Sequence, residues 1–400
     1  MENPAGKPVE RELPSLFVER FFQFLALLLL FISLLWGQNH LIYLSVLLLT
    51  MINGAKLWCK LGARNASAVV EIDRQKAFPG EKILLGCRLQ NSSWLPIWLQ
   101  IEIPLARGFF NSGVSLLRGG GGLIWREKIA WEWELVAPGR GYHKVGPLNL
   151  ISGDLLGFFQ QKREAVPSLW LTVYPRIVNL RPLSVSMKEF FGDRKGKSPI
   201  EDPAYPVATR DYRLGSPARH IHWKATLRHN RLQEKVFEHT LRKKVFLAID
   251  VEQFQKQADE EGFEAVLEVV ASLVLQLHAQ GCSTGLVSNG LSFLPGPVVL
   301  SLSRGEEHLQ SLLQALALLR LETGKSMAGM FRGLPDFLRG SVGLCFAHHR
   351  GLEVEEFAEI LQINKISAAF ILNSSPGGHL EKTGHSIYNL EEIRGGAADV

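Results

Sequence analysis

The chain has few cysteines and few of the short motifs that mark common catalytic sites. Among its 400 residues are four cysteines, and no two of them form a Cys-x-x-Cys pair. Their neighbours are largely apolar, which favours reduced, mostly buried thiols over a disulfide framework or a zinc site. There is no HExxH or Walker A motif, and the one match to Gly-x-Ser-x-Gly, at Gly281–Gly285, leads into the apolar strand STGLVS and not into a helix, as a nucleophile would require. The sequence therefore excludes ATP hydrolysis by a P-loop mechanism and offers no standard nucleophile.

A strong excess of charge of one sign is also absent. The formal net charge is +5, with 21% charged and 46% hydrophobic residues. This balance is that of a globular protein, and 400 residues suffice for two or three domains with a sizeable core. A mild positive excess does not by itself predict a nucleic-acid partner, and it suits a protein lying against anionic lipid equally well.

Two long apolar runs stand near the N-terminus, Phe21–Trp36 and Leu41–Trp58, and only Gly37–His40 separates them. Their length and composition favour a hairpin of two transmembrane helices. A cleaved signal peptide is one alternative, but a second apolar run stands where its cleavage site is expected. A soluble helical hairpin is the other alternative, and it would need a polar face that these runs lack.

Basic residues flank the predicted hairpin and are absent from its turn. Those before it are Lys7, Arg11 and Arg20, and those after it are Lys56, Lys60 and Arg64. The positive-inside rule then predicts both ends of the hairpin in the cytoplasm. The predicted location is the cell membrane, with the bulk of the chain cytoplasmic.

From Ser67 to Pro175 the apolar residues recur with a period close to two, which is typical of β-strands. Turn signals separate the strands at Phe78–Lys82, Gly119–Gly122 and Ala137–Gly141. Many short strands with such turns predict an antiparallel β-sandwich. The Gly119–Gly122 run lacks a following Lys-Ser/Thr and a following helix, so it is interpreted as a flexible hairpin turn and not as a phosphate loop.

After Lys244 the pattern changes to strands that alternate with helices, beginning with the apolar strand VFLAID at Val245–Asp250. This alternation predicts a doubly wound parallel α/β sheet with helices on both faces. Ligands of such sheets bind at the carboxyl ends of the strands, where the strand order reverses. Those ends carry Asp250, Ser288-Asn289 and His348-His349.

Several spaced motifs point to one family. They are FPGEKILLGCRLQN, GRGYHKVGPLNLISGDLLGFF, VYPR, and RDYRLGSPARHIHWKATLRHNRLQEKVFE before VFLAID. Together they resemble the bacterial family called domain of unknown function 58, from the hairpin to beyond Asp250. The matching signature positions are Tyr212, Gly215, Ile221, His222, Trp223, Lys224 and Leu232. The chain departs from the signature at Ser216, where the family usually has Asp.

The resemblance implies a fold and a partner, but no activity. The C-terminal domain of the family is similar to a von Willebrand factor A domain. Members tend to be encoded beside a MoxR-type AAA+ ATPase, which is the partner that the resemblance implies. The family's name records that its activity is unknown.

The metal site of von Willebrand A domains is degenerate in this sequence. Such domains can bind Mg²⁺ through an Asp-x-Ser-x-Ser run after the first strand, because a hard cation needs oxygen ligands at fixed spacing. Asp250 is in place, but Glu252 and Phe254 stand where the serines would be. The sequence therefore predicts no bound Mg²⁺ and no cofactor, while a softer metal on Asp250 with His348 or His349 stays conceivable.

The signature stretch is strongly basic. From Arg210 to Lys244 it holds ten basic residues, Arg210, Arg213, Arg219, Lys224, Arg228, Arg231, Lys235, Arg242, Lys243 and Lys244. His220 and His222 could form half of a zinc site, but no neighbouring Cys or His supplies the rest. In nucleic-acid binding, these basic residues would neutralise phosphates while Tyr212 and Trp223 stack on nucleobases. Aromatic residues are few in the stretch, however, and acidic residues are interspersed.

A structural joint between the two domains fits the signature stretch best. In that interpretation Trp223 is a buried anchor and Arg219 is partly exposed, while the basic face could also dock an acidic partner or lipid headgroups. The candidate interaction residues are Arg210, Tyr212, Gly215, Arg219, His222, Trp223 and Lys224.

The sequence thus predicts five regions and two functions. The regions are an N-terminal tail at 1–15, the transmembrane hairpin at 16–60, the β-sandwich at 66–180, the signature and joint at 181–240, and the von Willebrand A-like domain at 241–400. The favoured function is a membrane-anchored, non-catalytic scaffold or adaptor that works with a MoxR-type AAA+ ATPase in the assembly or maturation of other proteins. The alternative is a hydrolase or metal-dependent binding protein that uses Asp250 with His348 or His349.

Overall fold

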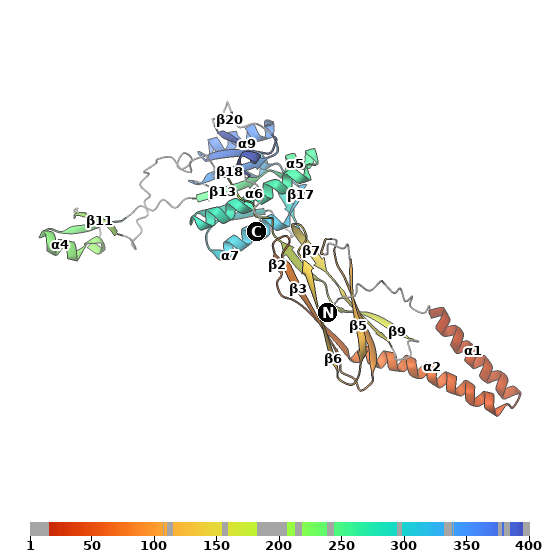
Figure 1. Ribbon diagram of the computed structural model, residues 1–400. Helices are drawn as coiled ribbons and strands as arrows, with labels where there is room; N and C mark the ends of the chain where they lie inside the picture. Colours follow the sequence, from red (N-terminus) through yellow and green to blue (C-terminus); the bar gives the residue numbers. More distant parts are fainter. Residues whose placement is uncertain are drawn as a thin grey trace. The chain divides into compact units, whose positions relative to one another are not determined.

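The chain forms two compact units, and the first ends at Tyr174. The computed structural model, drawn in Figure 1, describes residues 16–106, 108–109, 115–153, 159–181, 206–212, 218–237, 244–293, 298–331, 338, 340–374, 378–379 and 385–394. Each unit has a hydrophobic core of its own, so each is described by itself.

Two N-terminal helices open the first unit and pack against each other along their length. They are α1 (Leu16–Leu35) and α2 (Asn39–Asn65), drawn in red and orange in Figure 1. By length and composition α2 can cross a membrane, with a mean hydropathy of 1.6 and only 11% of its apolar window buried. The predicted helical hairpin is thus present as two apolar helices. The helix Glu260–Ala279 passes the same test, but 67% of its window is buried, as in a core helix.

Three sheets follow in the first unit. The first has the order β1 (Ala66–Ile72), β3 (Lys82–Asn91), β6 (Lys128–Val136); the second β5 (Leu116–Leu123), β4 (Ile97–Pro104), β8 (Leu148–Gly153), β9 (Gln160–Val166); the third β2 (Lys76–Ala77), β10 (Leu169–Val173), β7 (Gly141–Val145). All neighbours are antiparallel except β2 and β10. Every second residue of β3 and β4 is buried, and these residues share one apolar core, as the period of two predicts.

The prediction that Gly119–Gly122 is a hairpin turn is wrong. These glycines lie inside strand β5, and the turn to β6 falls at Ile124–Glu127 instead. A Cβ on Gly119 would lie 3.3 Å from the ring of Trp131, and one on Gly120 would lie 3.0 Å from the carbonyl oxygen of Leu99. The glycines are therefore explained by the close approach of other groups to this strand.

The second unit is built on a seven-stranded sheet with the order β16-β14-β13-β18-β19-β21-β20. The strands are β13 (Lys244–Ile249), β14 (Ser283–Ser288), β16 (Val298–Ser303), β18 (Val342–Ala347), β19 (Ser367–Leu372), β20 (Gly378–His379) and β21 (Ser386–Asn389). The five inner strands are parallel, while the edge strands β16 and β20 are antiparallel to their neighbours. The apolar strands predicted from the sequence are confirmed at β13, β14, β18 and β19, where nearly every residue is buried.

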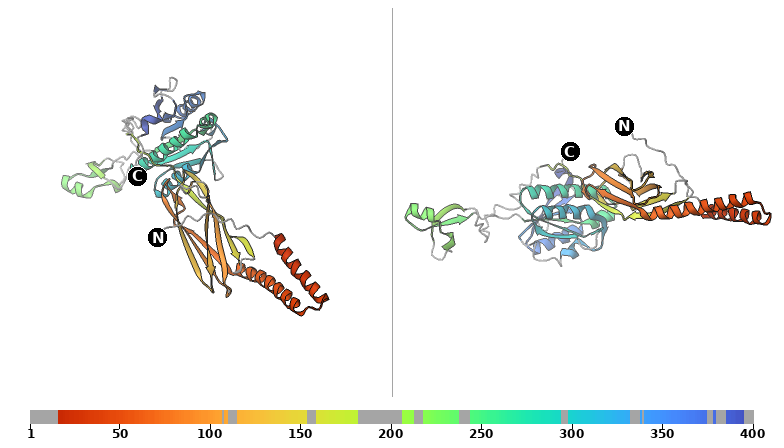
Figure 2. Two further views of the ribbon diagram at one scale, coloured as in Figure 1. Left: turned by 45° about the vertical axis from the view of Figure 1, so that its right-hand side comes forward. Right: turned by 90° about the horizontal axis from the view of Figure 1, so that it is seen from below.

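Helices cover both faces of this sheet (Figure 2). The helices are α5 (Val251–Gln257), α6 (Glu260–Ala279), α7 (Glu306–Leu318), α8 (Met327–Phe331), α9 (Leu352–Ile363) and α10 (Leu390–Ile393), and a short pair, β15 (Gly290–Ser292) with β17 (Leu319–Thr323), lies beside them. The chain passes from β13 to its neighbour β14 on one side, and from β18 to β19 on the other. The strand order therefore reverses between β13 and β18, where ligands of parallel sheets bind.

Candidate functional site

The signature stretch forms a small element of its own within the second unit. Strands β11 (Pro206–Asp211) and β12 (Gln233–Phe237) pair antiparallel, and the 3-10 helix Ala218–His220 and helix α4 (Trp223–His229) lie between them along the chain. The ring nitrogen Nδ1 of His222 accepts a hydrogen bond from the backbone N–H of Ala225 at 3.1 Å, which caps the start of α4. His222 is thus used as a helix cap in this structure.

Polar side chains hold this element together. Glu234 is buried and accepts a charge-assisted hydrogen bond from Nε of Arg210, while Gln233 donates to the carboxylate of Asp211. The backbone N–H of Tyr212 donates to the carbonyl oxygen of Leu232 at 2.8 Å. Arg210 and Tyr212 therefore stabilise the β11-β12 pair, which gives them a structural role next to any role in binding.

The prediction that Trp223 is a buried anchor is wrong. Its side chain is 66% exposed, and that of Leu227, one helical turn further along, is 81% exposed. Residues four apart share a helix face, so α4 presents a tryptophan and a leucine side by side to solvent. None of the residues of α4 is buried. Helix α4 therefore carries two large apolar side chains on its exposed surface.

Basic residues surround the exposed face of α4. Lys224, Arg228 and Arg231 are all exposed. We call Trp223, Leu227 and these three basic residues the α4 surface. Of the other candidate positions, Gly215 lies outside the described residues, and Arg219 lies in the 3-10 helix with its side chain outside the described part.

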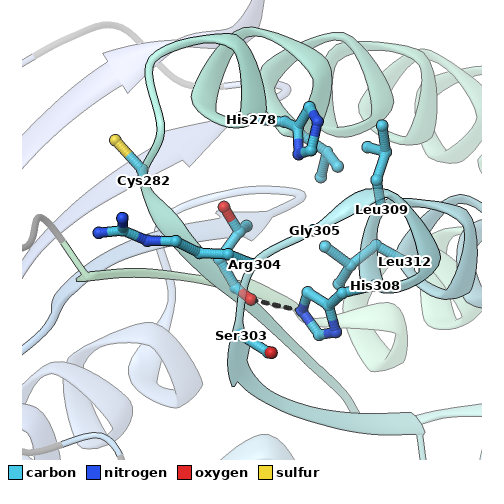
Figure 3. A pocket seen from close by; sticks show the side chains of 10 residues that line it. His278, Cys282, Ser303, Arg304, Gly305, His308, Leu309 and Leu312 are labelled. Carbon is cyan, nitrogen blue, oxygen red and sulfur yellow. Dashed lines mark hydrogen bonds between the residues drawn. The ribbon is translucent and has the colours of Figure 1, made fainter.

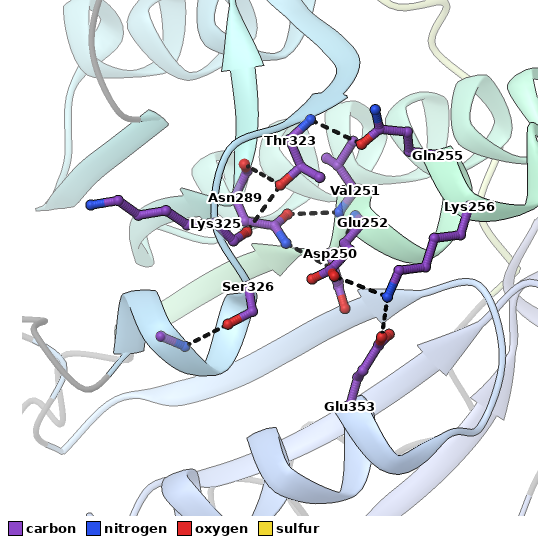
Figure 4. A network of polar contacts seen from close by, with 11 residues as sticks. Asp250, Val251, Glu252, Gln255, Lys256, Asn289, Thr323, Lys325, Ser326 and Glu353 are labelled. Carbon is purple, nitrogen blue, oxygen red and sulfur yellow. Dashed lines mark hydrogen bonds and ion pairs between the residues drawn. The ribbon is translucent and has the colours of Figure 1, made fainter.

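The second candidate site lies at the carboxyl ends of β13 and β14. Oδ1 of Asp250 accepts hydrogen bonds from Nδ2 of Asn289 at 2.8 Å and from the backbone N–H of Glu252 at 3.1 Å (Figure 4). Oδ1 of Asn289 accepts in turn from the backbone N–H of Val251 at 2.8 Å. Burial raises the pKa of Asp250 to about 6, more than these hydrogen bonds lower it. Asp250 is thus a buried carboxyl group tied to its neighbours.

A lysine pairs with two other carboxylates at this end of the sheet. Nζ of Lys256 lies 3.0 Å from the carboxylate of Glu252 and also pairs with Glu353 on α9. Hydrogen bonds to the two carboxylates raise the pKa of Lys256, and the bond from Lys256 lowers that of Glu353. The second position where a serine would stand, Phe254, is fully buried with its ring against those of Phe263 and His348. The polar groups near Asp250 are therefore paired with each other.

The two histidines after β18 meet partners other than Asp250. Nε2 of His348 lies 3.1 Å from Oδ2 of Asp259, which also accepts from Nδ2 of Asn373 at 3.0 Å. Nδ1 of His348 faces Nδ1 of His349 at 3.2 Å. Asp259 and Asn373 were not predicted as site residues, although Asp259 stands directly before Glu260-Glu261 and a long apolar helix, which is the pattern of a helix cap.

Neither histidine pair is arranged as a metal centre. Within the described ranges, no group of three His, Cys, Asp or Glu side chains could hold a metal ion. Asp259 fixes one ring nitrogen of His348, as a carboxylate does beside a general base, while the other ring nitrogen faces His349. Among the hydrogen bonds of the described residues, none joins the His348 ring to a nucleophile such as a serine or cysteine side chain.

A small cavity lies between α6, α7 and strands β14 and β16 (Figure 3). Its volume is about 10 Å³, which is room for one water molecule. The buried hydroxyl of Thr284 lines it and has no hydrogen-bond partner within the described structure. One water would satisfy that hydroxyl, so we regard the cavity as structural.

Comparison with known proteins gives a family but no activity. Residues 208–332 match the family described as "Protein of unknown function DUF58". The uncharacterized protein YeaD of Bacillus subtilis strain 168 is 25% identical over 264 residues, which are 64% of this chain and 63% of YeaD. The chain thus spans less than two thirds of the length of this relative.

Two similar solved structures each cover about a quarter of the chain. PapD-like domain 7 of human CEP192 is 17% identical over 26% of this chain and 82% of its own, with a TM-score of 0.17. The CARDB domain of PF1109 from Pyrococcus furiosus is 10% identical over 27% of this chain and 93% of its own, with a TM-score of 0.20. Neither likeness carries an argument. The resemblance to DUF58 that the motifs indicate is confirmed for residues 208–332, which include α4.

Proposed function

We propose that the chain is a membrane-anchored, non-catalytic adaptor that binds a MoxR-type AAA+ ATPase through the α4 surface. One observation carries this proposal: Trp223 and Leu227 are 66% and 81% exposed on one face of α4, inside the DUF58 region. Tryptophan and arginine are enriched among the residues that dominate binding at protein interfaces. The flanking Lys224, Arg228 and Arg231 fit an acidic partner surface.

The proposal assigns roles to the other parts of the chain. Helices α1 and α2 anchor it, with both ends of the hairpin in the cytoplasm, as the flanking lysines and arginines predict. The antiparallel sheets of the first unit act as a β-sandwich spacer. The parallel sheet of the second unit is a doubly wound, von Willebrand factor A-like domain that carries the β11-α4-β12 element as an insertion before β13.

The docking test compares substitutions of two exposed apolar residues. The full chain in nanodiscs is titrated with the purified ATPase, using Trp223→Ala and, as matched control, Leu352→Ala, because Leu352 is 85% exposed on α9. We expect Trp223→Ala to weaken binding by more than about tenfold, as loss of an interface anchor does, and Leu352→Ala to leave it unchanged. Equal affinities of wild type and Trp223→Ala would refute the proposal.

The orientation has a separate test. A reporter that is active only in the cytoplasm, fused after Val400, should be active. Activity of a periplasmic reporter at the same position would overturn the orientation and leave the docking result untouched.

A hydrolase or metal-dependent binding protein is the second candidate. The observation that favours it is the 3.1 Å contact between Nε2 of His348 and Oδ2 of Asp259, which orients the ring as in general-base catalysis. Here the base would be His348 with Asp259, and Asp250 would have no direct part. Loss of a hydrolytic activity in His348→Gln, with unchanged stability, would support this candidate.

A further inference from the structure

Two loops of the first unit expose large apolar side chains. Trp94, in the loop from β3 to β4, is 79% exposed, and Trp125, in the turn from β5 to β6, is 69% exposed. Ile124, beside Trp125, is 55% exposed. Tryptophan side chains are on average largely buried. Two that face solvent on neighbouring loops therefore indicate an interaction surface.

Hydrogen bonds join these loops to each other. The backbone N–H of Asn91 donates to the carbonyl oxygen of Glu127 at 3.0 Å. The buried side chain of Asn91 donates to the carbonyl oxygen of Leu95 at 2.8 Å, in the first loop, and lies 3.4 Å from that of Leu123, before the second. The two loops therefore form one end of the first unit, and Trp94 and Trp125 both lie at that end.

The same end of the unit is fixed to α2. The backbone N–H of Ser92 donates to the carbonyl oxygen of Asn65 at 3.0 Å, and Nε1 of Trp58 donates to the carbonyl oxygen of Pro96 at 2.7 Å. Helix α2 and strand β4 also approach closely at Gly62. A Cβ at this position would lie only 2.4 Å from Cγ2 of Ile97. The loop that carries Trp94 is thus bonded at both ends to the C-terminal turns of α2.

These bonds set the height of Trp94 relative to the apolar part of α2. Trp58 ends the apolar run, and Asn65 follows it by seven residues, or about 10 Å of helix. The headgroup layer of a bilayer is about 5–8 Å thick on each side of its hydrocarbon core. If the apolar run spans the core, Trp94 lies in or directly beside the headgroups on that side.

From this arrangement we propose that Trp94 and Trp125 insert into the headgroup layer of the bilayer that α2 crosses. The chemistry of the surface fits this layer, in which tryptophan is enriched because its ring is apolar and its N–H is polar. Exposed Arg126 and Lys128 stand beside Trp125, and Lys60 and Arg64 face out from α2, so anionic lipid is favoured, with Glu127 as the acidic residue in the turn. The contact holds the first unit against the membrane instead of leaving it on a free tether.

This inference rests on the proposed membrane anchoring, and the test separates the two. The native cysteines are all buried, so single introduced cysteines can carry an environment-sensitive fluorophore. We place it in the full chain at Trp94→Cys and, as control, at Leu84→Cys, which is 49% exposed at the opposite end of β3. Position 84 lies seven residues before Asn91 in the strand, a distance of about 23 Å. A third label at Leu47→Cys reports the apolar part of α2.

The labelled proteins are reconstituted in vesicles of phosphatidylcholine and phosphatidylglycerol that carry a lipid quencher near the headgroups. We expect about fivefold stronger quenching at position 94 than at position 84, because only the former lies within the interfacial layer. Quenching at position 47 by an acyl-chain quencher, without quenching at 94, would overturn this inference alone. Absence of quenching at both 47 and 94 would overturn the anchoring as well. A fluorophore at 94 that is shielded from water but not quenched by lipid would assign the surface to a protein or a second copy of the chain, against the proposal.

Discussion

The strand-end cluster around Asp250 and the α4 surface differ in what covers their side chains. At the strand ends, Asp250 is 7% exposed, and its neighbours Asn289, Glu252 and Lys256 pair with it or with other side chains. On α4, the large apolar residues point to solvent. A polar cluster that satisfies itself stabilises the fold, whereas an apolar face without cover is typical of a docking surface. In this protein the side chains at the strand ends, where parallel sheets usually bind ligands, are paired with each other. The exposed apolar residues lie instead on the α4 surface.

The largest expected effect is on the free energy of unfolding, which a substitution under the strand ends should lower far more than one on the α4 surface. Phe254, fully buried beside His348, is part of the core under the strand ends. Phe254→Ala should lower the free energy of unfolding by about 3–5 kcal/mol, whereas Trp223→Ala should change it by no more than about 0.5 kcal/mol. Denaturant unfolding followed by circular dichroism measures both. A Trp223→Ala protein as unstable as Phe254→Ala would break the comparison, because α4 would then be part of a core.

A second effect concerns the proton on Asp250. Burial raises its pKa to about 6 from an ordinary 3.8, so the folded state holds this proton more tightly than the unfolded chain. The stability that the protonated group provides is complete below the unfolded pKa and is lost as the pH rises through the folded pKa, a difference of about 3 kcal/mol. Asp250→Asn, which keeps the accepting oxygen, should therefore gain stability relative to wild type as the pH rises from about 4 to 6, and no more above.

The measurement for Asp250 is the difference in free energy of unfolding between wild type and Asp250→Asn at several pH values. Taking the difference cancels the titration of the other groups. A difference that is independent of pH, or that falls as the pH rises, would contradict a raised pKa of Asp250 in the folded protein.

The smallest effect is the response to Mg²⁺. Because Glu252 pairs with Lys256 and Phe254 lies in the core, the two positions where serines would stand offer this ion no free oxygen ligand. Wild type should keep its melting temperature in millimolar Mg²⁺, although a ligand at a hundred times its dissociation constant would add about 2.7 kcal/mol. A clear rise that disappears in Asp250→Ala would show a working metal site at the strand ends.

The sequence predicted those parts of the molecule that depend on local pattern. The strands of the parallel sheet were found because buried strands are apolar at every position, and Asp250 was found because it directly follows such a strand. The pairing of His348 with Asp259 was missed, because 89 residues separate them and only the assembled fold brings them together. Trp223 was predicted to be buried because aromatic residues usually are, and a single sequence carries no sign that this one faces solvent. The glycines at 119–122 were predicted to form a turn, because a single sequence does not show that Leu99 and Trp131, from the strands on either side, lie against them.

The central claim is that a partner meets the α4 surface and leaves the strand ends untouched. The most direct measurement places a photoactivatable cross-linking residue at Leu227 or, in a second protein, at Glu353, whose side chain is 40% exposed beside the strand ends. Each full chain, in nanodiscs, is irradiated with the purified MoxR-type ATPase. We predict a cross-linked product from position 227 and none from position 353. A product from position 353 with none from position 227 would contradict the account.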